Sequence, residues 1–345
     1  MTPSPTAIPT CPQCGGQIPP HLLYCPSCQR LVYANELKQL SDQALQAEQE
    51  NRLSDALAAW RQAFELLPLG SIQRQTIKDR IETLSLQLDG LAPQTPQNTS
   101  RRAKPSTSLF GKNGGGKAGL FGLLVVLFSK FKVLLLGLTK LHTLFSMLLF
   151  FGIYCQMWGW KFALGFVLSI YIHEMGHVVS LNHYGIKATA PVFIPFVGAI
   201  IRVKQTLTDP REDSRVGLAG PTWGLGAALA AYALYYATGD MVFAAIARIG
   251  AWINLFNLLP FWQLDGGRGF HALSRWQRWA AVAAVGAAWG ITQEGLLLVL
   301  MIFGVIKALD RNSPKEPDMT GLIQYVFLVA ILSMMCLIPV PTPGH

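Results

Sequence analysis

Charged side chains are scarce in this chain, at 14% of its 345 residues, and acidic ones are the rarer kind, with 19 Asp and Glu against 28 Lys and Arg. Hydrophobic residues make up 51% of the chain. This balance is typical of a multi-spanning membrane protein that carries a polar extension. No long apolar run occurs before about Leu120, so we expect no cleavable signal peptide.

The excess of basic residues gives a net charge of +9, which we do not interpret as a nucleic-acid signal. Many of these residues lie beside apolar segments, where the positive-inside rule places cytoplasmic charge. They are Lys130, Lys132, Lys140, Arg202, Lys204, Arg268, Arg275 and Arg278. The partner that this pattern indicates is the lipid bilayer.

Cysteine is also rare, and four of the six cysteines form two C-x-x-C pairs, Cys11 with Cys14 and Cys25 with Cys28. Two such pairs ten residues apart suit a tetrahedral zinc ion held by thiolates. Two disulfides, a redox pair and an iron–sulfur site are alternatives. We interpret residues 1–34 as a zinc-ribbon-like module in the cytosol, with a structural zinc that stabilises a segment too small for a core of its own.

Residues 35–90 show the periodicity of amphipathic helices. From Leu37 to Gly70 the pattern resembles one tetratricopeptide repeat, and Ile72 to Leu88 resembles its capping helix. One repeat buries little surface and usually needs a neighbour, so we expect it to dock on a protein partner, on a second copy or on the zinc module. A plain helical hairpin acting as a spacer is an equal alternative. Residues 91–118, rich in Pro, Ser, Gly and Lys, predict a flexible basic linker.

The remaining residues, 119–345, predict a membrane domain whose core is 141–275. Candidate spans are 141–158, 161–183, 216–238, 241–260 and 322–340; residues 277–309 hold two short spans or one kinked pair, and the run 119–138 suits the membrane interface. The charge bias is satisfied by a cytosolic N-terminus. We expect a multi-pass protein of a bacterial inner membrane.

The sequence His173-Glu174-Met175-Gly176-His177 is an HExxH motif inside an apolar stretch from Phe162 to Leu181. Residues four apart share one face of a helix, so both histidines can bind one metal ion with Glu174 beside it. In soluble helices the same motif is often only a pair of surface histidines. Ionisable side chains inside an apolar span are costly, however, which favours a functional site.

Residues 190–203 are rich in Val, Phe and Ile and contain Pro195 and Gly198, which predicts a short β-hairpin dipping toward the membrane. A simple packing loop is an equal alternative. A strand edge beside a metal site would allow a peptide to add as a further strand.

A catalytic zinc needs a third protein ligand. Asp265 is the downstream candidate, since it follows an apolar span and precedes Gly266 and Gly267, which permit a tight bend. Read alone, this Asp-Gly-Gly is an ordinary turn.

Taken together, HEMGH, Ala219-Gly220-Pro221 and Asn257-x-x-Pro260-x-x-x-Leu264-Asp265-Gly266 resemble the site-2 protease family of intramembrane metallopeptidases over residues 141–275. The resemblance implies that His173, His177 and Asp265 bind the catalytic zinc and that Glu174 is the catalytic base. It also implies that Asn257 holds the substrate or the developing oxyanion. The PDZ domain of some members is absent.

The sequence therefore predicts a mainly α, polytopic helical membrane protein, with a short β-hairpin beside the active site, a small N-terminal zinc knuckle and soluble helices. The predicted function is zinc metalloendopeptidase activity on peptide bonds in or near transmembrane segments of membrane-protein substrates. Zinc would activate the attacking water and Glu174 would act as general base. A non-catalytic membrane adaptor or scaffold is the main alternative, and a zinc transporter is a third.

Overall fold

The computed structural model describes residues 10–11, 13–19, 22–28, 30–90, 141–195, 198–201, 203, 207 and 209–340. The predicted linker and the run 119–138 lie outside the described residues. The chain divides into two compact units. The first comprises Met1–Ser100 with Asn182–Ile186, and the second comprises Arg101–Leu181 with Lys187–His345.

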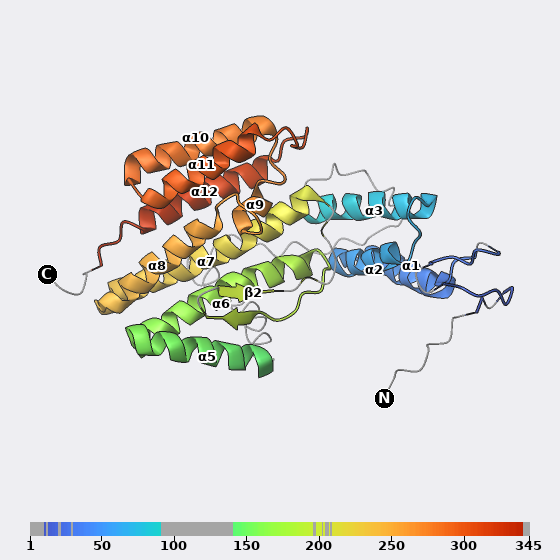
Figure 1. Cartoon of the computed structure of the whole chain (residues 1–345), viewed down its shortest axis with the longest axis horizontal. Coiled ribbons are helices and arrows are strands. Elements are labelled where there is room, and N and C mark those ends of the chain that lie inside the picture. Colours follow the sequence, from blue (N-terminus) through green and yellow to red (C-terminus); the bar gives the residue numbers. More distant parts are fainter. Residues whose placement is uncertain are drawn as a thin grey trace, which may run out of the picture. The chain divides into compact units, whose positions relative to one another are not determined.

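Three helices form most of the described part of the first unit (Figure 1): α1 (Ala34–Gln49), α2 (Leu53–Glu65) and α3 (Ile72–Leu88). Their shared core contains Leu40, Ala44, Leu57, Trp60 and Leu84, at the helical spacing that the sequence shows. The bounds of α3 are those predicted for a capping helix. That these helices are a tetratricopeptide repeat stays a prediction.

The described part of the second unit is mainly helical. Its helices are α5 (Leu141–Trp158), α6 (Trp160–His183), α7 (Pro210–Thr238), α8 (Met241–Asn257), α9 (Asp265–Gly269), α10 (Arg275–Thr292), α11 (Gly295–Leu309) and α12 (Met319–Met335). The last two residues of α6 belong to the first unit. In Figure 1, α7 and α8 run side by side, and α10, α11 and α12 form a group packed on them.

Among the described residues, one helix, α6, is long and apolar enough to cross a membrane. Four shorter apolar helices accompany it, at Thr143–Trp158, Met241–Asn257, Gly295–Leu309 and Met319–Met335. Residues 277–309 lie in two helices, because Gln293 takes a left-handed φ of 55° and ends α10. Both predicted alternatives, two short spans and one kinked pair of segments, contain two helices.

Helix α7 begins before the predicted span 216–238 because Asp209 and Pro210 start a helix there. The Asp209 carboxylate accepts a hydrogen bond from the backbone N–H of Arg211 at 2.8 Å, and proline suits the first helical position. The added residues include Glu212 and Asp213, so α7 begins with a polar turn that precedes its apolar part.

The predicted hairpin is present, as β1 (Val192–Ile194) and β2 (Gly198–Ile200). The strands are antiparallel, with Phe193 opposite Ala199, and an isolated bridge between Ala188 and Val203 extends the pairing. The backbone N–H of Phe193 donates to the Ser146 hydroxyl of α5 at 3.1 Å. This bond and the buried Phe193 ring attach the hairpin to the helices.

Candidate active site

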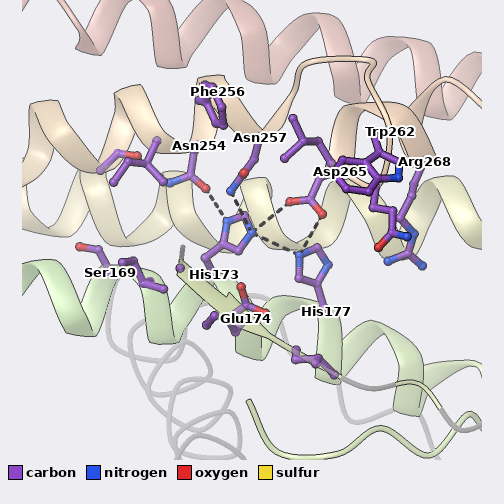
Figure 2. A pocket seen from close by; sticks show the side chains of 18 of the residues that line it. Ser169, His173, Glu174, His177, Asn254, Phe256, Asn257, Trp262, Asp265 and Arg268 are labelled. Atoms are coloured by element: carbon purple, nitrogen blue, oxygen red, sulfur yellow. Dashed lines mark hydrogen bonds and ion pairs between the residues drawn. The ribbon is translucent and has the colours of Figure 1, made fainter. Parts of the chain in front are cut away.

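The three predicted ligands of the catalytic metal come together in the second unit, although Asp265 lies 88 positions after His177 in the sequence (Figure 2). The two Nε2 atoms of His173 and His177 are 3.2 Å apart. The Asp265 carboxylate oxygens lie 3.0 Å from Nε2 of His173 and 3.2 Å from Nε2 of His177. All three side chains are buried.

These separations match the coordination shell of zinc. Bonds of about 2.0–2.1 Å from a tetrahedral zinc ion place neighbouring ligand atoms about 3.3 Å apart. The three observed distances are 3.0, 3.2 and 3.2 Å. The donor set, two imidazoles and one carboxylate, is also one that catalytic zinc uses.

The Nδ1 atoms, which are the outer nitrogens of the two imidazoles and face away from the ligand cluster, make hydrogen bonds that determine the tautomer of each ring. Nδ1 of His177 donates to the backbone carbonyl of Val216 at 2.8 Å, and a carbonyl can only accept. Nδ1 of His173 donates to the side-chain oxygen of Asn254 at 2.7 Å. The amide nitrogen of Asn254 in turn donates to the Gly250 carbonyl at 2.7 Å, which sets the amide orientation.

In the neutral imidazoles, both Nε2 atoms therefore present lone pairs to each other and to the Asp265 carboxylate. Acceptor atoms this close repel one another unless a proton or a metal cation lies among them. The hydrogen-bond network thus prepares His173, His177 and Asp265 to hold a metal ion.

Helix α7 passes directly against the imidazoles because glycine occupies its contact positions. A Cβ at Gly220 would overlap Nε2 of His177 and would lie 2.7 Å from Nε2 of His173. A Cβ at Gly217 would lie 2.6 Å from Cβ of Arg268, and one at Gly224 would overlap Asn254. Positions 217, 220 and 224 share one helix face. Ala219-Gly220-Pro221 is therefore part of the metal centre.

Two contacts determine where Asp265 lies. Asp265 is the first residue of α9, and a Cβ at Gly266 would overlap the Leu258 carbonyl, so glycine lets α9 fold back on the end of α8. Three residues on, Nε of Arg268 donates to Asp213 of α7 at 2.7 Å. Asp213 also accepts from Nδ1 of His271 at 2.7 Å. Burial alone would raise the pKa of Asp213, but these two partners lower it, so the bridge between α7 and α9 stays charged.

Glu174 lies between the two histidines on α6 and is buried (Figure 2). It is outside the ligand group and lines the same cavity, of about 750 Å³. Residues of β2 and of the strand-like segment after it line this cavity too: Gly198, Ala199, Ile201 and Val203. A peptide bound in the cavity would thus lie between the hairpin, Glu174 and the candidate ligands.

The sequence pointed to Asn257 as the functional amide, with Asn254 as the alternative, and it did not assign Asn254 the role that the structure gives it. The predicted functional amide was Asn257, whose Nδ2 lies 3.5 Å from Nε2 of His173, on the ligand side of the ring. Asn254 instead bonds the outer nitrogen of that ring and is 2% exposed. A buried amide in the apolar helix α8 was the available signal, since such a group needs a partner.

The two asparagines should therefore differ in their effects. Hydrogen bonds to the outer nitrogen of a metal-bound histidine typically contribute 10–100-fold to metal affinity. We expect Asn254→Leu to weaken zinc binding by about that factor. Asn257→Leu, the matched control on the same helix, should leave zinc affinity nearly unchanged and slow substrate cleavage. Competition with a chromophoric chelator measures the affinity, and equal affinities in the two variants would contradict this division of roles.

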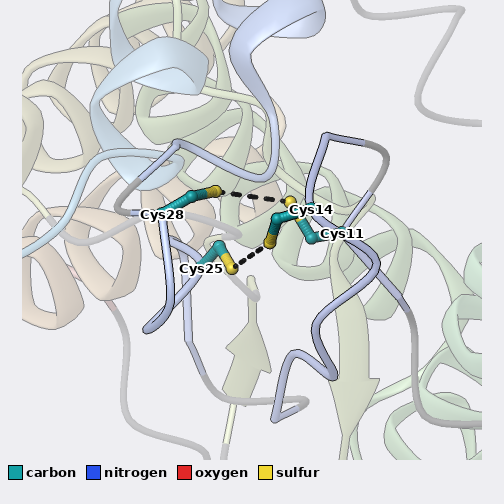
Figure 3. A group of neighbouring side chains, drawn as sticks. All are labelled: Cys11, Cys14, Cys25 and Cys28. Atoms are coloured by element: carbon teal, nitrogen blue, oxygen red, sulfur yellow. Dashed lines mark hydrogen bonds between the residues drawn. The ribbon is translucent and has the colours of Figure 1, made fainter.

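The four cysteines of the first unit form a second candidate metal centre (Figure 3). The sulfurs of Cys11 and Cys28 are 3.6 Å apart, as are those of Cys14 and Cys25. Tetrahedral Zn–S bonds of about 2.3 Å place sulfurs about 3.8 Å apart, whereas a disulfide needs about 2.0 Å. The geometry therefore fits one metal ion and excludes the two disulfides among the alternatives.

Backbone N–H groups turn toward these sulfurs and favour thiolates. N–H groups of Gln13 and Cys14 lower the pKa of Cys11 to about 6, and Cys25 is lowered chiefly by the N–H of Cys28. The N–H of Gly16 also lowers the pKa of Cys14, but the sulfurs of Cys25 and Cys28 raise it to about 12. Full ionisation of the four thiols thus requires a cation to offset their mutual repulsion.

We predict that Cys11→Ser combined with Cys14→Ser removes one metal ion per chain. Two of four thiolates would be lost, and the small module has little apolar core of its own around Ile18. Elemental analysis of the purified chain checks the count, with Cys155→Ser combined with Cys336→Ser as the matched control. An unchanged metal content in the first variant would argue against the site.

Two candidate metal-binding clusters, one of them beside a buried glutamate in a cavity, form the arrangement expected of a metal-dependent hydrolase. Comparison with known proteins supports this class. The family described as Peptidase family M50 matches residues 161–242, which include the HEMGH helix, the hairpin and α7. Asp265 lies beyond the matched segment.

Two curated proteins are similar to the chain. Zinc metalloprotease MJ0392 of Methanocaldococcus jannaschii is 28% identical over 156 residues, which cover 43% of this chain and 44% of that protein. Probable zinc metalloprotease EGY2, chloroplastic, of Arabidopsis thaliana is 28% identical over 237 residues, covering 52% of this chain and 41% of that protein. The matches thus span less than half of either relative. No solved structure matches the chain.

Proposed function

We propose that this chain is an intramembrane zinc metalloprotease that hydrolyses peptide bonds in or near transmembrane segments of membrane proteins. The observation that carries the proposal is the convergence of His173, His177 and Asp265, with lone pairs facing one another, beside the buried Glu174. The similarity to zinc metalloproteases supports peptidase chemistry.

The residues present fit zinc at the three-residue centre, and bound zinc would supply Lewis-acid polarisation and a water acidic enough to react at neutral pH. Asn254 and the Val216 carbonyl hold the two imidazoles in the ligand tautomer. Glu174 accepts the proton of the attacking water and delivers it to the leaving amine. The side-chain N–H of Asn257 donates to the substrate oxygen that becomes negative.

The hairpin suggests how a substrate binds. Gly198 and Ala199 of β2 line the cavity, and β2 pairs with β1 as the only strand partner among the described residues. We propose that an unwound stretch of the substrate adds to β2 as an extended strand. Local unwinding is required because the amides of an intact helix are occupied by their own hydrogen bonds.

The placement in a membrane is part of the same proposal. The apolar helix α6 and the four shorter apolar helices support a multi-pass arrangement. We propose that the N-terminus is cytosolic, that the chain lies in a bacterial inner membrane, and that the three-helix segment binds a protein partner. A reporter fused near Arg211 should then read as cytosolic.

The function is tested with the full chain in lipid vesicles that also carry a membrane protein with one apolar helix as substrate. We expect cleavage within or beside that helix. Removal of metal with a chelator should reduce cleavage to the background, and added zinc should restore it, because the ligand atoms come from separate segments that the ion holds together. Cleavage that persists after the chain has lost its metal would refute the proposal.

A further inference from the structure

The C-terminal end of the HEMGH helix is capped partly from a distant part of the sequence. Locally, the backbone N–H of Gly185 donates to the Asn182 carbonyl at 3.1 Å. The last four carbonyls of an α-helix lack partners within the helix and need other donors. At the end of α6, the Ser54 hydroxyl of α2 donates to the His183 carbonyl at 2.7 Å. About two turns further along α2, Nε of Arg61 donates to the Tyr184 carbonyl at 3.2 Å. These donors come from 129 and 123 positions earlier in the sequence.

The five residues Asn182–Ile186, which we call the post-motif segment, accordingly belong to the first unit. Tyr184 is 2% exposed, and its hydroxyl donates to Asp89 at the end of α3 at 2.7 Å. Ile186 is fully buried, and Arg61 is 6% exposed. A buried guanidinium at a helix C-terminus also interacts favourably with the helix dipole.

Gly185 brings the backbone of the post-motif segment against the backbone of α2. Its φ of +70° is left-handed, and a Cβ there would lie 2.5 Å from the Ser54 carbonyl and 2.6 Å from the backbone nitrogen of Ala58. The backbone of the post-motif segment therefore lies directly on the backbone of α2. Only glycine provides both the conformation and the space.

We propose that helices α1–α3 bind the post-motif segment as an intramolecular ligand and thereby fix the C-terminal end of the HEMGH helix. The surface that binds it comprises Ser54, Ala58 and Arg61 of α2 and Asp89 after α3. His177 lies six residues before His183 on the same helix, about 9 Å along its axis. The three-helix segment thus reaches the metal-ligand helix through continuous backbone, and its release frees that helix end.

The test compares two glycine substitutions in the full chain by hydrogen–deuterium exchange. Gly185→Ala introduces a methyl group against α2. Gly70→Ala is the matched control, because Gly70 has a φ of +78° in the same unit but nothing within 4 Å of its Cβ position. Both variants carry left-handed alanine strain, so their difference reports the lost contact.

We expect the amides of residues 178–186 to exchange at least about tenfold faster in Gly185→Ala than in Gly70→Ala, as for a helix end that opens locally. Equal exchange in the two variants would overturn the proposal. So would faster exchange confined to 182–186, since the end of α6 before Asn182 would then be held independently.

A second variant covers the case in which Gly185→Ala unfolds the three-helix segment. Ser54→Ala removes only the half-buried hydroxyl that donates to the end of α6. Thr76→Ala is its control, because the Thr76 hydroxyl donates within α3, to the Ile72 carbonyl. Faster exchange at 178–186 in Ser54→Ala alone supports the proposal, and equal exchange opposes it. The readout is structural, so it does not depend on peptidase activity.

Discussion

Glu174→Gln should abolish detectable cleavage while leaving the metal bound. Glutamine keeps the size and hydrogen-bonding shape of the side chain but cannot accept the proton of the attacking water. Proton transfer by a positioned group typically contributes about 10²–10⁴-fold to a rate, so we expect a loss of at least that size. Cleavage of the vesicle substrate and zinc content, measured on the same preparation, check both halves of the prediction.

The exposed Glu82→Gln on α3 is the matched control and should cut normally. An adaptor or scaffold would not need Glu174, so the prediction also separates the enzyme from the main alternative. Undiminished cleavage by Glu174→Gln would eliminate the proposed mechanism even if the chain were still a protease.

Gly220→Ala should remove the catalytic metal without any change to a ligand. The new methyl group would overlap Nε2 of His177, the atom that would bind the ion. The two helices meet backbone to backbone at this point, since a Cβ at Gly176 would lie 2.6 Å from the Ala219 carbonyl, so the added methyl group has no free space to enter. We expect loss of zinc from this centre and loss of cleavage, read by metal analysis and by the vesicle assay.

Gly226→Ala is the control on the same helix, because nothing lies within 4 Å of its Cβ position. It should keep both zinc and activity, and alanine is the better helix former. Full zinc occupancy in Gly220→Ala would contradict the prediction, because it would show that α7 leaves room for a methyl group beside the imidazoles. The two variants each add one methyl group to α7, so the difference in their zinc content reports how closely this helix packs against the metal site.

The parts of the site that the sequence predicted are those governed by local periodicity. His173 and His177 lie four apart, and any helix brings them to one face. The hairpin was predicted from Pro195, Gly198 and their β-branched neighbours, and its pairing of Phe193 with Ala199 agrees. Asp265 was found through its position after an apolar span and through the family resemblance.

The parts that the sequence did not predict depend on tertiary contacts. No local pattern distinguishes Asn254 from Asn257, three residues apart on one helix, and only the packing of α8 on α6 decides which amide meets Nδ1 of His173. Gly220 was recognised within a motif, but its role follows from how closely α7 passes the imidazoles. Ser54 and His183 are separated by 129 positions, and neither carries a signal that they meet.

The two candidate centres also differ in chemical hardness. Four thiolates select soft ions, while two imidazoles with a carboxylate accept harder ones such as cobalt or manganese. Cadmium should thus concentrate in the cysteine cluster and leave the histidine cluster to cobalt. A chain loaded with both ions would carry cadmium in the cysteine cluster and cobalt in the histidine cluster. The two ions differ spectroscopically, so each centre could be followed in the presence of the other.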